Sequence, residues 1–346
     1  MGIDAVYTYD IAGLKSAISE HNSFVLTCHL NPDGDALGST LGLRHVLRQM
    51  GKEATVITPD LPPTNLMWIP GAKGIRTYER DIEACDAIID AADCIIMMDF
   101  NELTRLKQLG NKLSSSKKFT ILVDHHLDPI VKCDVMISNP KASATAEIIF
   151  SCLRDMSFID YIDVRAATCF YIGIMTDTGG LSYNSSDPNL YILIAELLKR
   201  GVDKDSVHDM IFNNKSLRRL RLMGYALNRK TMRIGDLPVS LMTLSREELD
   251  KYKYNTGDTE GFVNFPLQAK NIICSIFLME RPDGIKISLR SKGDFSVSEF
   301  AQHYYKGGGH FNASGATYHG TFDDACETVK RDMIEYCEGK LNKTQN

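Results

Sequence analysis

Short apolar segments alternate with helix-period segments through the first half of the chain, and this alternation restricts the fold more than any other feature. Each apolar segment is rich in β-branched residues and short enough to be a buried strand. The segments between them, such as 36–50 and 79–91, have the spacing of helices, and Gly51 is placed to end the first of these. The expected strands are SFVLTC, EATVIT, DCIIMMD, FTILVD and CDVMIS. We therefore predict an α/β fold with a mostly parallel sheet and helices on both faces.

The second half of the chain changes from helical to strand patterns. Residues 143–175 and 188–229 have the pattern of helices, with Pro188 placed to begin one of them. Strand patterns return in LPVSLMTLS, NIICSIFLME and GIKISLRS, and a last helix is expected near 322–339. These changes predict a first domain over 1–195, a helical linker over 196–229 and a smaller α/β domain over 230–346, with a cleft between the two domains.

Composition limits the compartment and the partners of the chain. A formal net charge of −5 and a pI of about 6.0 leave no excess of positive charge to hold a long nucleic-acid duplex. The nine cysteines are scattered without a C-x-x-C pair, which favours reduced thiols. No apolar segment approaches the roughly 20 residues of a membrane span, and the N-terminus lacks an export pattern. We expect a cytoplasmic protein without a membrane anchor, and a homodimer is compatible with these features.

Polar side chains recur where the expected strands end. They are His29, Asp99, Asp124, His125 and His126, with Asp177 at the end of the apolar helix RAATCFYIGIMTD. Each has an ordinary explanation when taken alone. In HLNPDGDALGS, for example, Asn-Pro-Asp-Gly is common turn chemistry, and Asp35 would cap a helix that begins at Ala36. Because the carboxyl ends of parallel strands share one edge of a sheet, we nevertheless expect these groups to lie together.

Crowded acids of this kind point to bound cations. Carboxylates a few ångströms apart cannot all ionise without compensation, and a pair of divalent ions would supply it. Carboxylates and imidazoles without cysteine suit hard to borderline ions, so we expect Mn²⁺ first, with Mg²⁺ or Co²⁺ as alternatives. Two such ions close together promote in-line attack on a phosphoryl group. The pattern therefore predicts phosphoester hydrolysis.

Several ordered motifs give this pattern a family resemblance. HLNPDGDALGS, MDFNELTRL, VDHH, NPKASATAEI and TDTGG resemble the successive motifs of the DHH phosphoesterase superfamily. SLRS followed by KGGGHFNASG resembles the DHH-associated C-terminal domain. The likeness covers nearly the whole chain. The length and the two-domain plan are most similar to the branch of bifunctional oligoribonucleases, or nanoRNases, that are also phosphatases of 3′-phosphoadenosine 5′-phosphate (pAp).

The resemblance implies a role for each motif residue. One metal would be held by His29, Asp33 and Asp99, and the other by Asp35, Asp99, His125 and Asp177. Asp99 would then bridge the two ions. His126 would contact the scissile phosphate and help to protonate the leaving oxygen, while Asp124 would orient its neighbours. Arg105 is interpreted as a structural ion-pair former, and no motif includes the remaining histidines, His21, His45, His208, His303 and His319.

The second domain is expected to bind the substrate. In GIKISLRS, apolar residues alternate with Lys286, Ser288 and Arg290, so a strand would bury the first set and present these three. Arg290 is thereby a candidate phosphate ligand. Three glycines alone usually indicate a flexible loop. The resemblance, however, implies that the nucleotide is bound away from its reacting phosphate by Arg290 together with Gly307, Gly308, Gly309 and His310.

By this resemblance the chain would hydrolyse short oligoribonucleotides to mononucleotides and pAp to AMP, so its partner would be a short RNA or a small nucleotide. Two enzymatic alternatives stay open. One is a pyrophosphatase or exopolyphosphatase, whose second domain is of a different type without GGGH, and the other is a phosphodiesterase of linear or cyclic dinucleotides. A third alternative is a nucleotide-binding protein without catalytic activity. The acids and histidines are intact at every motif position, which argues against this alternative.

Overall fold

The structure, a computed structural model, describes residues 8–344, except the side chains of His310 and of residues 340–344. The chain divides into two compact units, and the division falls between Asn213 and Asn214. The expected linker 196–229 is accordingly shared, because its residues up to Asn213 belong to the first unit and the helix that follows belongs to the second. No helix in this described part of the chain is long and apolar enough to cross a membrane.

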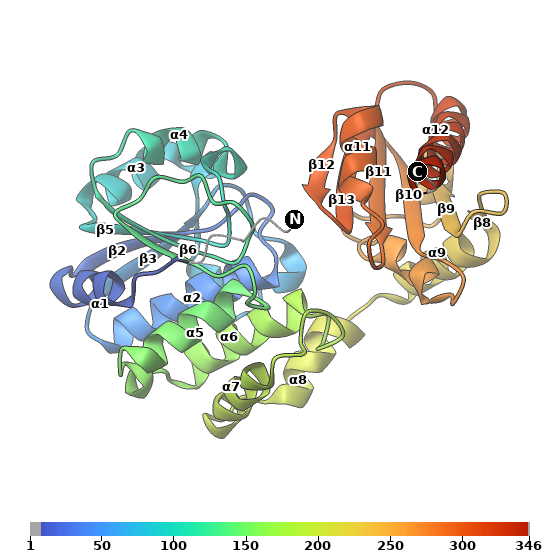
Figure 1. The fold of residues 1–346 in the computed structure, drawn as a ribbon. Coiled ribbons are helices and arrows are strands. Elements are labelled where there is room, and N and C mark those ends of the chain that lie inside the picture. Colours follow the sequence, from blue (N-terminus) through green and yellow to red (C-terminus); the bar gives the residue numbers. More distant parts are fainter. Residues whose placement is uncertain (1–7, 345–346) are drawn as a thin grey trace. The chain divides into compact units, whose positions relative to one another are not determined.

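A seven-stranded sheet forms the centre of the first unit, in the order β1-β7-β6-β5-β2-β3-β4 (Figure 1). The strands are β1 (Thr8–Tyr9), β2 (Ser23–Thr27), β3 (Glu53–Thr58), β4 (Arg76–Thr77), β5 (Cys94–Met98), β6 (Phe119–Asp124) and β7 (Val135–Ser138). β1 pairs antiparallel with β7, and every other pair is parallel. The predicted mostly parallel sheet is confirmed. The edge strands β1 and β4 are too short for a sequence period to indicate them.

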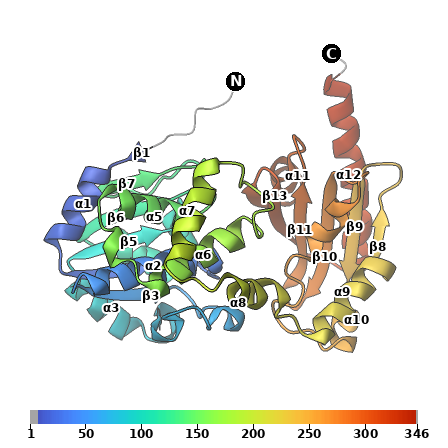
Figure 2. The ribbon, with the colours of Figure 1, turned by 90° about the horizontal axis from the view of Figure 1, so that it is seen from below.

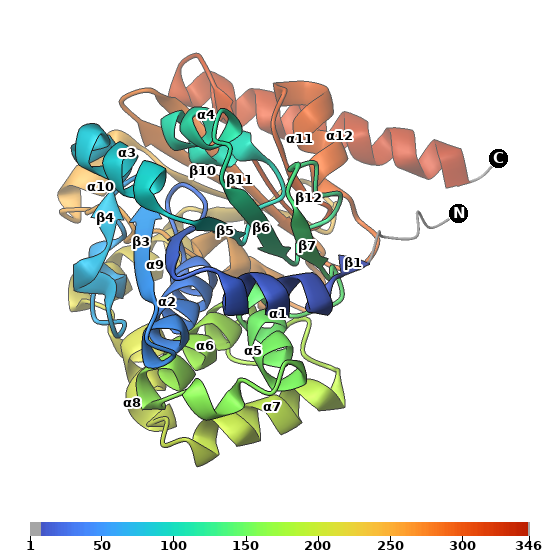
Figure 3. The ribbon, with the colours of Figure 1, turned by 90° about the vertical axis from the view of Figure 1, so that its left-hand side faces the viewer.

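Helices cover both faces of this sheet, as predicted (Figure 3). α3 (Ile82–Ala91) and α4 (Gln108–Ser114) pack on one face. The other face is covered by α1 (Ile11–Glu20), α2 (Gly34–Gln49), α5 (Thr145–Asp155) and α6 (Val164–Asp177), with α7 (Pro188–Lys199) packed against α5 and α6. α8 (Lys204–His208) ends in a π-helical turn, Asp209–Asn213. Short 3₁₀ turns occupy Thr64–Leu66, Ala72–Gly74, Tyr78–Arg80, Leu103–Leu106 and Ile159–Tyr161.

Local signals explain several of these helix positions. Pro188 is the first residue of α7, as predicted, and the Asp187 side chain caps it by accepting a hydrogen bond from the backbone of Asn189 (2.9 Å). Gly173 permits the close packing of α6 on its neighbours. A Cβ at this position would lie 2.6 Å from the Cβ of Ala146 and 2.7 Å from a carboxylate oxygen of Asp35. Glycine therefore lets α2, α5 and α6 meet beneath the carboxyl edge of the sheet.

The second unit contains a six-stranded sheet in the order β12-β13-β11-β10-β9-β8. The strands are β8 (Thr231–Arg233), β9 (Val239–Leu244), β10 (Cys274–Arg281), β11 (Gly284–Ser291), β12 (Gly308–His310) and β13 (Ala313–Tyr318). β9 and β10 are parallel, and the other pairs are antiparallel. The predicted smaller α/β domain is confirmed, with β9, β10 and β11 where the strand patterns returned.

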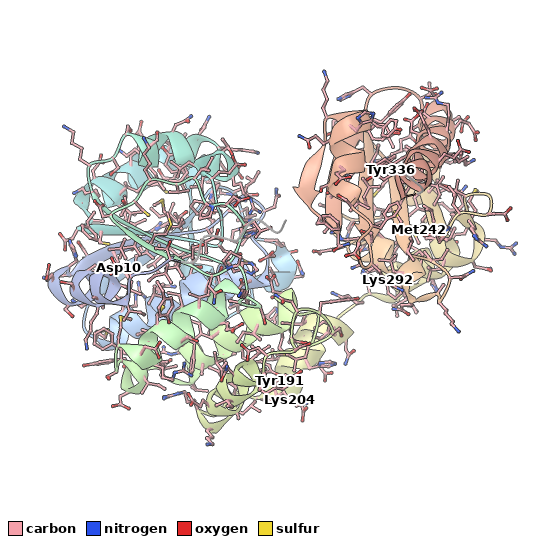
Figure 4. All side chains as sticks on the ribbon, viewed as in Figure 1. Asp10, Tyr191, Lys204, Met242, Lys292 and Tyr336 are labelled. Carbon is pink, nitrogen blue, oxygen red and sulfur yellow. The ribbon has the colours of Figure 1, made fainter. Side chains whose placement is uncertain are left out.

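Two apolar clusters lie on opposite faces of this second sheet. α11 (Val297–Tyr305) and α12 (Phe322–Thr344) cover one face, where the ring of Tyr336 packs 5.4 Å from that of Phe300 (Figure 4). α9 (Leu217–Arg229) and a 3₁₀ helix, Phe262–Gln268, cover the other face, where Met242 is buried (Figure 4). α9 contacts β8 and β9, and α10 (Arg246–Lys251) contacts β10; these elements can be followed in Figure 2. Leu222 and Ala226 of α9 belong to this second core, which explains why the helix joins the second unit.

Candidate metal centre and active site

Three neighbouring parallel strands bring the motif residues to one edge of the first sheet. β6, β5 and β2 are adjacent, so their carboxyl ends meet at the same edge. Asp124 ends β6, Asp99 directly follows β5, and His29 lies just beyond β2. Asp99 has a φ of +65°, and its backbone N–H donates a hydrogen bond to the carbonyl of Val123 (3.0 Å). The chain thus leaves the sheet directly after β5, and the Asp99 carboxylate is buried at this edge.

The first motif contributes two aspartates with different surroundings. α2 begins at Gly34, and its N-cap is Asp33, which accepts hydrogen bonds from the backbone N–H groups of Asp35 and Ala36 (both 3.0 Å). The interpretation of Asp35 as the helix cap is therefore wrong. Asp35 is fully buried, and its two carboxylate oxygens accept hydrogen bonds from the backbone N–H groups of Thr145 (2.6 Å) and Ala146 (3.0 Å). The first turn of α5 thereby holds the Asp35 side chain in place.

Ligand-type atoms of the expected metal residues gather within a few ångströms. His29 Nε2 lies 3.5 Å from Asp99 Oδ2 and 3.8 Å from Asp33 Oδ2. His125 Nε2 lies 3.5 Å from Asp99 Oδ1 and 3.3 Å from Asp177 Oδ2. In three sets of three residues, each residue offers one potential ligand atom and these atoms all lie within 4.8 Å of one another. The sets are His29–Asp33–Asp99, Asp35–His125–Asp177 and Asp99–His125–His126. All six expected ligands are brought together, with Asp99 in two sets. Their ligation of metal stays a prediction.

The acids of this cluster resist ionisation next to one another. Burial and the nearby charges of Asp99 and Asp177 hold the pKa of Asp35 well above its usual range. Burial and neighbouring carboxylates likewise raise the pKa of Asp177 to about 8. Asp99 differs: burial opposes its ionisation, but the hydrogen bond from His29 together with the nearby charges of His125, His29 and His126 outweighs burial and lowers the pKa. Bound cations would compensate these charges, so the set of carboxylates and imidazoles fits a pair of divalent ions.

His126 lies beside this cluster, between Asp124 and Arg105. Its Nδ1 lies 2.7 Å from Asp124 Oδ1, and its Nε2 lies 3.2 Å from Arg105 Nη1. A guanidinium can only donate, so Nε2 accepts and the neutral ring carries its proton on Nδ1, from which it donates to Asp124. Among the described residues, Arg105 forms no ion pair with an acid. It is therefore not the structural ion-pair former that we expected, and it belongs to the site.

Thr145 is a second site residue that the sequence reasoning missed. Its hydroxyl donates a hydrogen bond to Asp99 Oδ1 (3.0 Å), while its backbone N–H donates to Asp35 (2.6 Å). The residue is fully buried at the start of α5. It therefore fixes two carboxylates that come from different strands and helices. The available signal was its place within NPKASATAEI, a motif that we recognised without giving Thr145 a role.

Two strands of the second sheet carry the expected nucleotide-binding residues: Arg290 lies on β11, Gly308, Gly309 and His310 lie on β12, and β13 separates the two strands. Arg290 of β11 is paired with Ser275 of β10 and with Ala313 of β13, and Ala313 is paired with His310 of β12. Paired residues share one face of a sheet. Arg290 is half-buried, its Nη1 donates to the carbonyl of Leu289 (2.9 Å), and burial lowers its pKa. The side chain of His310 lies outside the described residues.

Two of the three glycines, Gly308 and Gly309, belong to a strand rather than to a flexible loop, and Gly307 directly precedes it. This strand, β12, pairs antiparallel with β13. A Cβ at Gly309 would lie 2.5 Å from the carbonyl oxygen of Ala313, and one at Gly307 would lie 2.4 Å from that of Gly315. Gly309 also has a φ of +139°. The pairing of the two strands therefore requires glycine, and nucleotide binding by these residues stays a prediction.

Comparison with known proteins decides the family. The DHH family N-terminal domain matches residues 23–174, and the DHHA1 domain matches residues 240–336. A bifunctional oligoribonuclease and PAP phosphatase from Thermus thermophilus is 30% identical over 306 residues, which are 88% of this chain and 87% of the relative. The chain belongs to the DHH family. As a member of this family it is a phosphoesterase, and the resemblance drawn from the motifs is confirmed.

Solved structures share the fold of this DHH protein. An exopolyphosphatase-related protein from Bacteroides fragilis is 40% identical, with a TM-score of 0.92 over 94% of this chain and 96% of that one. The exonuclease RecJ bound to manganese is 14% identical, with a TM-score of 0.56 over 97% of this chain and 96% of the exonuclease. The second likeness shows the fold alone. Both chains are covered almost completely, so the two-unit organisation is shared.

Proposed function

We propose that this DHH phosphoesterase hydrolyses short oligoribonucleotides to mononucleotides and pAp to AMP. The observation that carries the proposal is the convergence of His29, Asp33, Asp35, Asp99, His125 and Asp177 at one sheet edge, which is the donor set of a two-metal phosphoesterase. The substrate class is supported by the relative from Thermus thermophilus, whose name gives these two activities. A short RNA or a small nucleotide is the expected partner.

Two divalent ions are the proposed cofactors, with Mn²⁺ preferred and Mg²⁺ or Co²⁺ as alternatives. His29, Asp33 and Asp99 would hold one ion, and Asp35, Asp99, His125 and Asp177 would hold the other, which makes Asp99 the shared ligand. Such ions supply an activated water and compensate the charge that develops on the phosphoryl group. The bonds from Thr145 and Ala146 to the buried carboxylates support this arrangement, because they restrict the carboxylates before any ion binds.

The chain's own residues would position the phosphate. Arg105 donates a hydrogen bond to His126 (3.2 Å), and its guanidinium suits the fork-like recognition of a phosphate. Asp124 holds the proton of His126 on Nδ1, so Nε2 becomes an acid only if the ring takes up a second proton. We therefore assign His126 to phosphate contact and protonation of the leaving oxygen, and Asp124 to the orientation of His126. Asp99, Asp124 and His126 remain the proposed catalytic residues.

The second unit would bind a part of the nucleotide other than the reacting phosphate. Arg290 carries its charge in a half-buried position on β11, and β13 separates it from Gly307, Gly308 and Gly309, of which the last two are exposed. We assign phosphate recognition to these residues and to His310. A homodimer and a cytoplasmic location are parts of the same proposal.

Exopolyphosphatase activity is the second candidate function. It is favoured by one observation, the 40% identity to the exopolyphosphatase-related protein from Bacteroides fragilis. The metal centre would serve either reaction, because both break a bond to phosphorus. The two candidates differ in the substrate, since only the first requires recognition of a nucleoside.

One product analysis separates the candidates. The protein with Mn²⁺ is offered a labelled pentaribonucleotide, pAp, polyphosphate, pyrophosphate and a cyclic dinucleotide side by side. We expect mononucleotides from the RNA and AMP from pAp. The His125→Ala variant should lose both activities, whereas His319→Ala, which changes an exposed histidine outside every motif, should keep them. Turnover of polyphosphate or pyrophosphate alone would contradict the proposed substrate, and turnover by the His125→Ala variant would contradict the metal assignment.

A further inference from the structure

A second concave site lies at the same edge of the first sheet as the expected metal ligands. The sheet order continues from β2 through β3 to β4, and β3 pairs in parallel with β4 through Ile57–Arg76 and Thr58–Thr77. Residues around β4 therefore lie at the carboxyl end of β3. They line a pocket of about 330 Å³, together with Leu61, Met67 and the start of α3. The position of β4 at this end of the sheet can be followed in Figure 3.

The wall of this pocket is positively charged. Lys73, Arg76 and Arg80 line it, and all three are exposed. None of them forms an ion pair with an acid in residues 8–344. Asp81 is the one carboxylate among the lining residues, and it accepts a hydrogen bond from the backbone N–H of Ala84 (3.2 Å) as the cap of α3. Three cations and one acid that is already engaged leave the pocket suited to an anion.

A buried arginine stands behind this wall. Arg44 of α2 is only 7% exposed, and its guanidinium donates a hydrogen bond to the carbonyl of Gly71 (3.0 Å). A Cβ at Gly74 would lie 3.0 Å from the same guanidinium, so Arg44 directly supports the segment 71–74 that carries Lys73. Its Nε has no hydrogen-bond partner among the described residues. Arg44 therefore adds a fourth positive charge and fixes the segment from within.

The pocket is tied to the segment that holds the expected metal ligands. The backbone N–H of Asn31, two residues beyond His29, donates a hydrogen bond to Asp60 Oδ1 (2.9 Å). The hydroxyl of Thr58 donates to the carbonyl of Asp60 (2.8 Å), and Leu61 follows as a lining residue. One hydrogen-bonded loop thus joins the two sites. Strands lie about 4.8 Å apart, so across the sheet β4 is about 10 Å from β2 and about 14 Å from β5, which Asp99 directly follows.

We propose that this pocket is a second phosphate subsite, which binds an oligoribonucleotide beyond its reacting end. The inference rests on the proposed function. A distance of about 10 to 14 Å corresponds to about three or four stacked nucleotides at a rise of about 3.4 Å each, so an RNA of four or five nucleotides reaches the pocket. A dinucleotide and pAp do not. Arginines bind the phosphate oxygens and offer their planes to a base, and the apolar residues Leu61 and Met67 cover its other surface.

Kinetics with substrates of two lengths test this subsite. The Arg76→Ala/Arg80→Ala variant should raise the KM of a pentaribonucleotide about tenfold, while the KM of a diribonucleotide and both kcat values stay within about twofold. Arg154→Ala/Arg165→Ala removes the same charge from exposed positions at the far ends of α5 and α6, and it should change neither KM. An unchanged pentanucleotide KM, an equal effect on both lengths, or an equal effect of the control variant would overturn the inference.

A binding measurement separates this inference from the proposed function. If the unaltered protein cleaves neither RNA, the proposed function fails while the pocket can still be tested. Fluorescence anisotropy of a labelled pentaribonucleotide in EDTA then reports binding without turnover. Binding that weakens about tenfold in Arg76→Ala/Arg80→Ala, and less steeply in Lys73→Gln, supports the subsite. Equal binding by the unaltered protein and both variants, or no binding at all, overturns it. Circular dichroism of each variant checks that the fold is kept.

Discussion

The guanidinium of Arg105 lies 3.2 Å from Nε2 of His126, while Nδ1 of the same ring lies 2.7 Å from Asp124. The ring is thus held from both sides, and a cation stands where a phosphate would approach it. We predict that Arg105→Met lowers kcat for pAp about 100-fold, because one donor to a developing phosphoryl charge is lost. Binding of Mn²⁺, measured by titration calorimetry, should stay within about twofold. Undiminished turnover, or a loss of metal binding, would contradict this role.

Asp99→Asn should abolish turnover and weaken the binding of both ions. The backbone of Asp99 has a φ of +65°, which asparagine tolerates, so the variant removes the charge without straining the chain. Titration with Mn²⁺ reports the number and the affinity of the bound ions. Asp128→Asn is a matched control, because Asp128 is exposed and has a φ of +51° outside the metal-type groups. Retained activity in Asp99→Asn would exclude the bridging role.

Thr145→Val should reduce both stability and turnover by modest amounts. The substitution removes the hydroxyl that donates to Asp99 but keeps the backbone N–H that donates to Asp35. One buried hydrogen bond of this kind contributes about 1 kcal/mol to the free energy of unfolding, with a greater loss if the acceptor stays unpaired. Urea unfolding in EDTA and kcat for pAp measure the two effects. Thr145→Ser should restore both, and a serine variant no better than valine would show that the hydroxyl is not responsible.

The metal-free protein should become less stable as the pH rises from about 5 to 9. Burial and neighbouring carboxylates raise the pKa of Asp177 from 3.8 to about 8. Between these two pH values the unfolded chain ionises more readily than the folded protein, so the free energy of unfolding falls as the pH rises. The pKa of His29 is raised to about 9 because the hydrogen bond and charge of Asp99 outweigh burial. The stability that protonated His29 contributes is fully present below pH 6.5 and is lost as the pH rises through about 9.

Melting temperatures in EDTA at pH 5.5 and 8.5 measure how the stability of the metal-free protein depends on pH. Addition of Mn²⁺ should raise the melting temperature more at pH 8.5, where the protons no longer compete for the carboxylates. Asp177→Asn removes one of the two titrating groups and should flatten the metal-free profile. A metal-free protein that is more stable at pH 8.5 than at pH 5.5 would show that the cluster is compensated in another way.

Arg290→Ala should mainly raise the KM of pAp, by about tenfold, with little change in kcat. Arg290 belongs to the second unit and is not among the expected metal ligands, so its loss removes binding rather than chemistry. Arg281→Ala is the matched control, because Arg281 is exposed at the end of the paired strand β10. Steady-state kinetics of the two variants give the comparison. Equal KM values in both would remove Arg290 from the binding site.

The sequence predicts the strands that carry the site because each is a short buried segment with its own local pattern. SFVLTC, DCIIMMD and FTILVD correspond to β2, β5 and β6, and the polar residues at their ends were expected to converge for that reason. The alternation along β11 likewise indicates that Arg290 and Lys286 are presented while Ile287 is buried. Such features depend only on neighbours along the chain.

The order of the strands, the partners of Asp35 and the contact between Arg105 and His126 depend instead on segments that are distant in sequence. Asp35 contacts the start of α5, more than a hundred residues away, and Arg105 reaches His126 across the sheet edge. No local period encodes such a contact, because it follows from how the helices pack on the sheet. The sequence alone therefore determined the fold class and the six candidate ligands. Only the tertiary structure bound Asp35 to the start of α5 and brought Arg105 and Thr145 into the site, since packing sets the approach of side chains from separate elements.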